Sequence, residues 1–146
     1  MKNNTYLPKI IINNQNNYNV PFNLYNYIHM TCQLLSLSVE HLEITFLSVE
    51  NIQKMNNEHF STDSPTDTIS FNLSTADNLL GDIYICPTVI KKNASTYDET
   101  YEKEFKIVII HSILHLVGYT DSDSNSRDEM IVKQNKIYKQ LLTNEL

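Results

Sequence analysis

The chain has 146 residues, of which 41% are hydrophobic and 19% charged, which is enough apolar material for one folded domain and too much for a disordered protein. Its formal net charge of -6 excludes a protein that holds nucleic acid through a global basic field, so any RNA contact must be local. The apolar run at residues 10–12 is too short for a signal-peptide core or a membrane span, so we expect a cytoplasmic protein that forms one domain over residues 1–146.

Patterns typical of strands and helices alternate along the first half of the chain. Residues 10–12 suit a short strand, and apolar residues at helical spacing over residues 22–35 predict a helix. Residues 42–49 alternate apolar and polar side chains, which predicts a strand with one buried face. Residues 51–60 are expected to form a short helix.

Two further strands are predicted in the middle of the chain. Residues 68–71 and 79–86 are rich in β-branched and aromatic side chains, which favour extended backbone. A loop through Asp77 and Asn78 is expected to join the two strands.

The C-terminal part of the chain has helical patterns. One helix is expected after Pro87, and a second over residues 99–117 is apolar on nearly all sides, which places it at the centre of the fold. Ser126 and Glu129 have the spacing of a capping box and predict the start of a terminal helix. Together these elements predict an α+β fold, a small mixed sheet of about four strands packed with about five helices.

A group of metal-ligand residues lies at the end of the predicted central helix. His111 and His115 are four residues apart, so both imidazoles leave one face of the helix and can bind one ion. Gly118, one of two glycines in the chain, can adopt the positive φ that ends a helix, and the reversal brings Asp121 toward the same ion. Two neutral imidazoles and one carboxylate suit a single zinc ion, which keeps an open position and lowers the pKa of a bound water to about 7.

Two alternatives remain open at this site. The histidines can instead be core residues bonded to backbone carbonyls, with Asp121 capping the last helix, although a shared ion is a simpler partner for two imidazoles on an apolar helix. Asp123 competes as the third ligand, but the spacing of Asp121 from the glycine turn fits known zinc helices better. The other histidines have no spaced partner and are interpreted as surface or rim residues: His29, His41 and His59.

The string HSILHLVGYTD, with TDTISF and LLGDIYI upstream, resembles the YbeY family of metal-dependent endoribonucleases over about residues 55–130. That family's zinc segment usually follows the pattern H-G-x-L-H-L-x-G-x-D-H. His111 and His115 match its first two ligands, and Asp121 falls at its third histidine, while Thr120 stands at its preceding aspartate. The resemblance therefore implies a His-His-Asp variant of the family's zinc site.

One position departs from the family in a way that affects RNA binding. Phe60 stands where the family commonly carries an arginine thought to serve RNA binding or catalysis, so no cation can be assigned there. The lysines available elsewhere are interpreted as solvated: Lys54, Lys91, Lys92, Lys103 and Lys106. The resemblance implies a single-strand-specific endoribonuclease that matures small-subunit ribosomal RNA and acts in ribosome quality control. Its implied partners are ribosomal RNA and the small subunit or assembly factors, with no membrane and no DNA.

Three functions compete on this sequence. The resemblance favours a zinc-dependent endoribonuclease. A metalloprotease shares the two-histidine helix and the glycine turn, but Ser112 stands where that class places the glutamate that takes a proton from water. The third is a non-catalytic, zinc-stabilised ribosome-assembly factor. No general acid or base is assigned beyond the ion; Ser70 and Asp67 are the candidates, with Tyr119 beside them.

Overall fold

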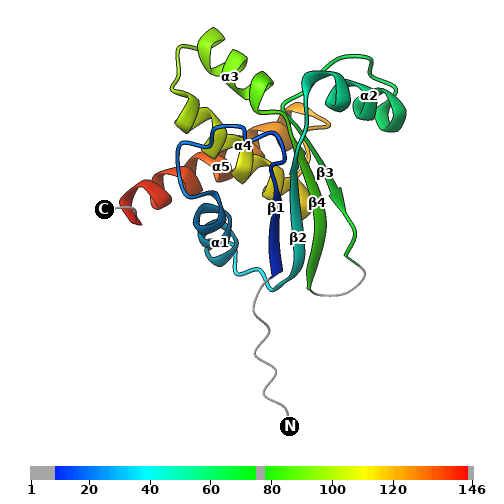
Figure 1. Cartoon of the computed structure of the whole chain (residues 1–146). Helices are drawn as coiled ribbons and strands as arrows, with labels where there is room; N and C mark the ends of the chain where they lie inside the picture. Colours follow the sequence, from blue (N-terminus) through cyan, green and yellow to red (C-terminus); the bar gives the residue numbers. More distant parts are fainter. Residues whose placement is uncertain (1–8, 75–77, 145–146) are drawn as a thin grey trace.

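The computed structural model describes residues 9–74 and 78–144, which contain four strands and five helices (Figure 1). The elements are β1 (Lys9–Asn13), α1 (Leu24–Leu34), β2 (Val39–Phe46), α2 (Val49–Phe60), β3 (Thr68–Asn72), β4 (Leu79–Ile85), α3 (Pro87–Thr96), α4 (Tyr101–Leu116) and α5 (Ser124–Asn144). This confirms the predicted α+β class. Asp77, expected in the loop between β3 and β4, lies outside the described residues.

The four strands form one mixed sheet in the order β1-β2-β4-β3. β2 runs parallel to both β1 and β4, whereas β3 is antiparallel to β4 and forms an edge of the sheet. Ile44 of β2 lies opposite Ile83 of β4, and both are buried in the main core. Residues of a strand point alternately to the two faces, so the same strands also present polar side chains on the other face.

Helix α4 is the centre of the molecule, as its apolar sequence predicts. Its side chains Phe105, Ile109 and Ile113 are fully buried, and the helix contacts α1, α3, α5, β3 and β4. Gly81 of β4 permits this close approach, because an added Cβ would lie 3.0 Å from a methyl carbon of Leu116. The sheet and the surrounding helices therefore fix the position of α4.

Helix α2 lies at one end of the sheet, near β3 and β4 (Figure 1), and contributes to a second apolar cluster. This cluster joins Ile52 of α2 to Ile69 of β3, with Met55, Phe71 and Tyr84 packed against it. Successive residues of β4 divide between the clusters, since Ile83 belongs to the main core and Tyr84 to this one. The end of α2 is thereby held beside the edge strand β3.

The predicted boundaries of β2 and α2 shift by a few residues. β2 ends at Phe46, not Val49, because Ser48 begins the next helix: its hydroxyl oxygen accepts a hydrogen bond of 3.2 Å from the backbone N–H of Asn51. Asn, Asp, Ser and Thr favour this position at a helix start because they satisfy free backbone N–H groups. No helix in the described ranges is both long and apolar enough to cross a membrane.

The predicted capping box at the last helix is wrong. α5 begins at Ser124, and Asp123 is its cap. The backbone N–H of Ser126 donates to Asp123 Oδ1 over 2.8 Å, and the Ser126 hydroxyl donates to Oδ2 over 3.1 Å. Ser126 therefore lies inside the first turn and does not form the expected box with Glu129, because the aspartate caps the helix at an earlier position.

The interpretation of Lys106 as a solvated residue is also wrong. This side chain on α4 is only 2% exposed. Its ammonium lies 2.9 Å from the carboxylate of Glu102 and 5.4 and 5.3 Å from the ring centres of Phe22 and Tyr27. A buried charge needs such partners, so Lys106 is part of the packing of α4 and is not a surface cation.

Candidate metal centre

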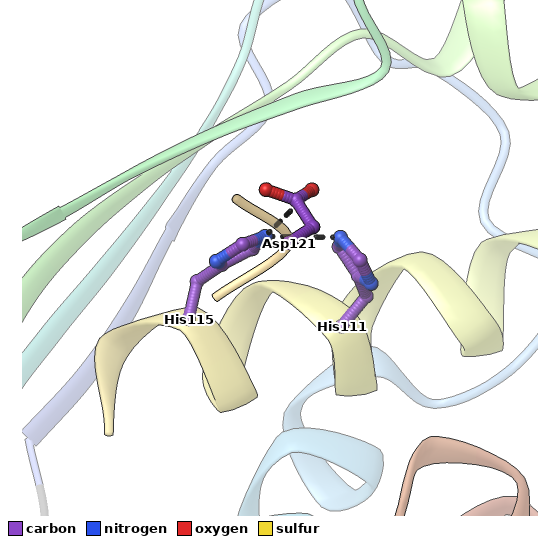
Figure 2. A group of neighbouring side chains, drawn as sticks. All are labelled: His111, His115 and Asp121. Carbon is purple, nitrogen blue, oxygen red and sulfur yellow. Dashed lines mark hydrogen bonds and ion pairs between the residues drawn. The ribbon is translucent and has the colours of Figure 1, made fainter. Parts of the chain in front are cut away.

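Two imidazoles converge at the C-terminal end of α4 (Figure 2). The spacing of His111 and His115 places them one turn apart on one face of the helix. Their Nε2 atoms are 3.1 Å apart, and the two rings meet edge to face with centres separated by 4.6 Å. Both side chains are half-buried, in contrast to the fully buried residues around them.

Each imidazole is oriented through its other ring nitrogen. His111 Nδ1 is 2.9 Å from Gln134 Oε1 of α5, and His115 Nδ1 is 3.1 Å from the carbonyl oxygen of Tyr119. Because both partners are oxygen acceptors, each Nδ1 carries the hydrogen and each neutral ring keeps its lone pair on Nε2. Two lone pairs therefore face each other across 3.1 Å. They repel each other without a partner, and a shared cation would stabilise them.

The turn after α4 supplies one of these oxygen acceptors. Gly118 has φ +105°, which strains any residue with a Cβ. The Gly118 N–H donates to the His115 carbonyl over 3.2 Å and the Tyr119 N–H to the Leu114 carbonyl over 3.1 Å, the pair of bonds that closes a helix in the Schellman motif. The expected reversal at Gly118 is present, and it directs the Tyr119 carbonyl back to His115.

The same turn carries Asp121 to the two imidazoles. Its Oδ2 lies 3.8 Å from His115 Nε2, and one ligand atom from each of His111, His115 and Asp121 lies within 4.8 Å of the others. The Asp121 side chain is 56% exposed and that of His115 is 28% exposed, so the group opens to solvent on the aspartate side. Asp123, the competing ligand, is instead used as the cap of α5.

The environment keeps His115 uncharged at neutral pH. Burial lowers the pKa of its imidazole below the ordinary 6.5, and the neighbouring His111 lowers it further. Asp121 and the hydrogen bond to the Tyr119 carbonyl act in the opposite direction, with a smaller effect. A metal ligand must be deprotonated at the binding nitrogen, so this shift favours metal binding at neutral pH.

The donor set fits zinc. Two neutral imidazole nitrogens and one carboxylate oxygen are ligands that zinc accepts in catalytic sites. Nitrogen atoms bound to zinc at about 2.0–2.1 Å in tetrahedral directions lie roughly 3.3 Å apart. The Nε2 atoms of His111 and His115 are 3.1 Å apart, so an ion at bonding distance from both requires only small adjustments.

A cavity of about 480 Å³ opens beside this group and brings the other candidates together. It is lined by α2, the segment before β3, β3 itself and the turn after α4, and Asp67, Ser70 and Tyr119 all contribute to its wall. The Ser70 hydroxyl donates to the Ser112 carbonyl over 3.2 Å, and Asp67 Oδ1 accepts from the Thr66 hydroxyl over 3.3 Å. Their assignment as acid or base remains a prediction.

Ser112, the residue after His111, has a structural role. It is fully buried, and its hydroxyl donates to the Val108 carbonyl over 2.7 Å while lying 2.8 Å from the hydroxyl of Thr68. Asn72 adds a third link from the edge strand, donating to the Leu116 carbonyl over 3.0 Å. Polar side chains of β3 therefore join the edge strand to α4 at Ser112 and Leu116, the residues that follow the two histidines.

Gln134 is a residue of the candidate site that the sequence pattern did not reveal. It is buried, and it occupies one position of the apolar stripe of α5, between Met130 and Ile137. A single polar side chain at that spacing signals a buried hydrogen-bond partner, but the sequence does not say which residue it meets. The other histidines take no part in the group: His29 stacks on Tyr25, His41 pairs with Glu43 and His59 is exposed.

A mixed sheet over a two-histidine helix, closed by a glycine turn and a carboxylate, defines the class of the chain as a candidate metal-dependent hydrolase. Comparison with known proteins gives the family. Residues 10–142 match the family model described as Endoribonuclease YbeY. The chain therefore belongs to the YbeY family.

Individual relatives agree with this assignment. The chain is 35% identical to Endoribonuclease YbeY of Chloroherpeton thalassium over 75% of its length and 77% of the relative. It is 40% identical to that of Thermotoga maritima over 66% of its length and 64% of the relative. A solution structure of a Thermotoga maritima protein superposes with a TM-score of 0.65 at 28% identity, covering 92% of this chain and 90% of the other.

Proposed function

We propose that this chain is a zinc-dependent, single-strand-specific endoribonuclease that acts in the cytoplasm on the small-subunit ribosomal RNA precursor and in ribosome quality control. Residues 1–146 would form one hydrolase domain, with ribosomal RNA and the small subunit or its assembly factors as partners. Membership of a family whose relatives are named endoribonucleases supports this proposal. The chemistry of the candidate site supports it independently.

The observation that carries the proposal is the convergence of three donor atoms on one point at the wall of a cavity. His111, His115 and Asp121 would hold one zinc ion, which supplies Lewis acidity toward a phosphate and lowers the pKa of water when bound. The exposed Asp121 and the open cavity support a catalytic role, since structural zinc sites are closed by four protein ligands.

The residues around the ion have separate tasks in this proposal. Gln134 and the Tyr119 carbonyl hold the imidazoles with their lone pairs toward the ion. The hydroxyl hydrogen of Ser70 is already given to Ser112, so Ser70 would position the edge strand. Asp67 keeps a carboxylate oxygen free of the Thr66 bond within the same cavity, which makes it the better placed of the two candidates for a proton acceptor.

The two other functions have less support. A protease of this type needs a general base after the first histidine, and Ser112 is buried and donates to Val108. An assembly factor in which zinc only stabilises the fold predicts a closed site, and Asp121 is on the open side. A cleavage assay separates these possibilities from the nuclease.

The test compares Asp121→Ala with Asp128→Ala, a matched change of an exposed carboxylate on α5. We expect Asp121→Ala to keep its circular-dichroism spectrum, to lose bound zinc and to stop cutting single-stranded RNA, whereas Asp128→Ala behaves as the unmodified protein. Chelation should stop cleavage and added zinc should restore it. Cleavage that persists after complete metal removal overturns the proposal, and unfolding of Asp121→Ala points to a structural ion.

A further inference from the structure

Aromatic rings form a continuous cluster at the end of α2 beside the metal cavity. We call the rings of His59, Phe60, Phe71 and Tyr84 the aromatic cluster. Phe60 lies nearly parallel to Phe71, at 11° with ring centres 6.1 Å apart. His59 and Tyr84 meet Phe71 edge to face at 5.2 and 6.0 Å. Phe71 is therefore supported on several sides, whereas Phe60 is exposed.

Phe60 is the member of the aromatic cluster that reaches the cavity. It lines the same cavity as His111, His115 and Asp121. With Phe71 against one side, Phe60 is still 53% exposed, so part of the ring is open to a ligand in the cavity. A free aromatic surface therefore forms part of the wall of the cavity that His111 and His115 also line.

The backbone around Phe60 is held in place. Phe60 is the last residue of α2, and Ser61 ends the helix at φ 54° with its N–H bonded to the Asn57 carbonyl over 3.0 Å. The segment that follows is tied back to the helix, since Asn56 donates to the Ser64 carbonyl over 3.0 Å and Gln53 to the Asp63 carboxylate over 3.1 Å. The ring is held on a fixed element, so binding of a ligand to it costs little conformational entropy.

The charge of the cavity determines which part of an RNA this wall can bind. Among the described residues that line it there is no lysine or arginine, and Asp67 and Asp121 are both acidic. Neutralisation of phosphates by side-chain cations, the usual source of nucleic-acid affinity, therefore cannot act at this wall. Aromatic faces bind bases without charge, because every base has a π-face.

We propose that Phe60 is a stacking platform for one unpaired base of the RNA whose backbone enters the metal cavity. This inference rests on the proposed function and names how that site recognises its substrate. Phe71 acts as a positioning residue behind Phe60. A base in a duplex is covered by its neighbours and cannot stack on a protein ring, so the platform selects single strands.

The experiment measures binding of a short fluorescent single-stranded RNA to the zinc-loaded full chain, with a gel on the same samples to verify that the RNA is intact. Phe60→Ala is compared with Phe60→Trp, Phe60→Leu and Tyr97→Ala. Tyr97 is the matched control because it is 70% exposed and does not line the cavity. Because Phe60 is exposed, its truncation should leave the fold intact, which thermal melting checks.

We expect Phe60→Ala to weaken binding by about five- to a hundredfold, the range for loss of one base–aromatic stack. Phe60→Trp should bind within about twofold of the unmodified protein. The slope of log affinity against log salt should be unchanged, because no phosphate contact is lost. In cleavage assays Phe60→Ala should raise KM and leave kcat unaltered.

A second measurement uses RNAs that lack one base at a time. Removal of the base that stacks on Phe60 should weaken binding of the RNA to the unmodified protein. The same removal should cause no further loss of binding to Phe60→Ala. Equal binding by Phe60→Ala and Tyr97→Ala overturns the platform, as does full binding by Phe60→Leu, which keeps apolar bulk without a π-face. Either of these two results would favour the aromatic cluster as a surface for a protein partner. Base-dependent binding without any cleavage refutes the nuclease proposal alone.

Discussion

The two walls of the cavity are built from opposite kinds of side chain. The ligand wall, formed by α4 and the turn after it, presents His111, His115 and Asp121, and a hydrogen bond to Nδ1 orients each imidazole. The aromatic wall, at the end of α2, presents the ring of Phe60 supported by Phe71. The ligand wall carries oriented donor atoms and a charged carboxylate, whereas the aromatic wall offers an uncharged ring surface.

We infer from this difference that the ligand wall serves catalysis and that the aromatic wall serves binding of the substrate. Metal ligands must point at one place within a few tenths of an ångström, so the ligand wall needs buried hydrogen bonds to hold it. Stacking on a π-face tolerates any base and small shifts of position, so the aromatic wall needs only a firm support. Changes on the ligand wall should therefore act on turnover, and changes on the aromatic wall on binding.

The largest effect is expected from His111→Ala, with His41→Ala as the matched control. His41 is a half-buried histidine paired with Glu43 on the sheet, away from the candidate site. Removing His111 would delete a proposed ligand, so zinc affinity should fall by more than the roughly 10- to 100-fold typical of losing an outer partner. A competition titration with a zinc dye measures this, and RNA cleavage should be lost at every substrate concentration.

His41→Ala should retain zinc and activity. If His111→Ala binds zinc as tightly as the unmodified protein, the ligand assignment is wrong. If it loses zinc but Phe60→Ala changes kcat to the same extent, the separation between the two walls is wrong.

A smaller effect is expected from Gln134→Ala, compared with Asn135→Ala. Gln134 accepts the hydrogen bond from His111 Nδ1, whereas Asn135 is the adjacent exposed residue on α5. Loss of this acceptor frees the ring to rotate and should weaken zinc binding by about 10- to 100-fold. Gln134→Glu keeps an acceptor oxygen and should stay closer to the unmodified protein.

At saturating zinc, Gln134→Ala should recover most of its cleavage activity, because the ligands themselves remain. Equal zinc affinities of the alanine variants at positions 134 and 135 would show that the Nδ1 hydrogen bond does not orient His111.

The convergence of the two imidazoles was predictable from sequence, and the residues that orient them were not. Spacing of four residues on an apolar helix places His111 and His115 on one face whatever the rest of the fold does. The glycine turn was predictable for the same reason, because the positive φ at Gly118 is a local property. Gln134 lies 23 positions from His111, and only the packing of α5 on α4 shows that they meet.

The aromatic wall needed tertiary structure as well. Phe60 ends α2 and Phe71 lies on the edge strand, and the sequence contains no periodicity that connects them. The misinterpretations of Lys106 and Ser126 have a related cause. A lysine on a helix is solvated unless aromatic rings and a carboxylate enclose it, and two polar residues near a helix start compete for one cap. In both cases neighbours outside the local pattern decide the outcome.

The smallest effect is expected from Asp123→Ala, which touches neither wall. Asp123 accepts hydrogen bonds from the backbone N–H and the hydroxyl of Ser126, and these hold the pKa of its carboxyl below the ordinary 3.8. A carboxyl whose pKa is lowered by folding stabilises the folded state above its unfolded pKa, and the contribution is lost as pH falls through the folded value. Asp123→Ala should therefore melt at a lower temperature than the unmodified chain at pH 7.

The difference should shrink as the pH falls below about 3.8, the ordinary aspartate value. Melting curves of the metal-free proteins at a series of pH values measure it, since acid removes the ion in any case. Asp123→Asn keeps an acceptor oxygen for the helix start at every pH, so it should melt near the unmodified chain at pH 7 and lack the acid-dependent part. An unchanged zinc affinity of Asp123→Ala at pH 7 would distinguish this cap from the ligand Asp121. Zinc loss comparable to that of Asp121→Ala would instead assign Asp123 to the ligand wall and remove the distinction between the two aspartates.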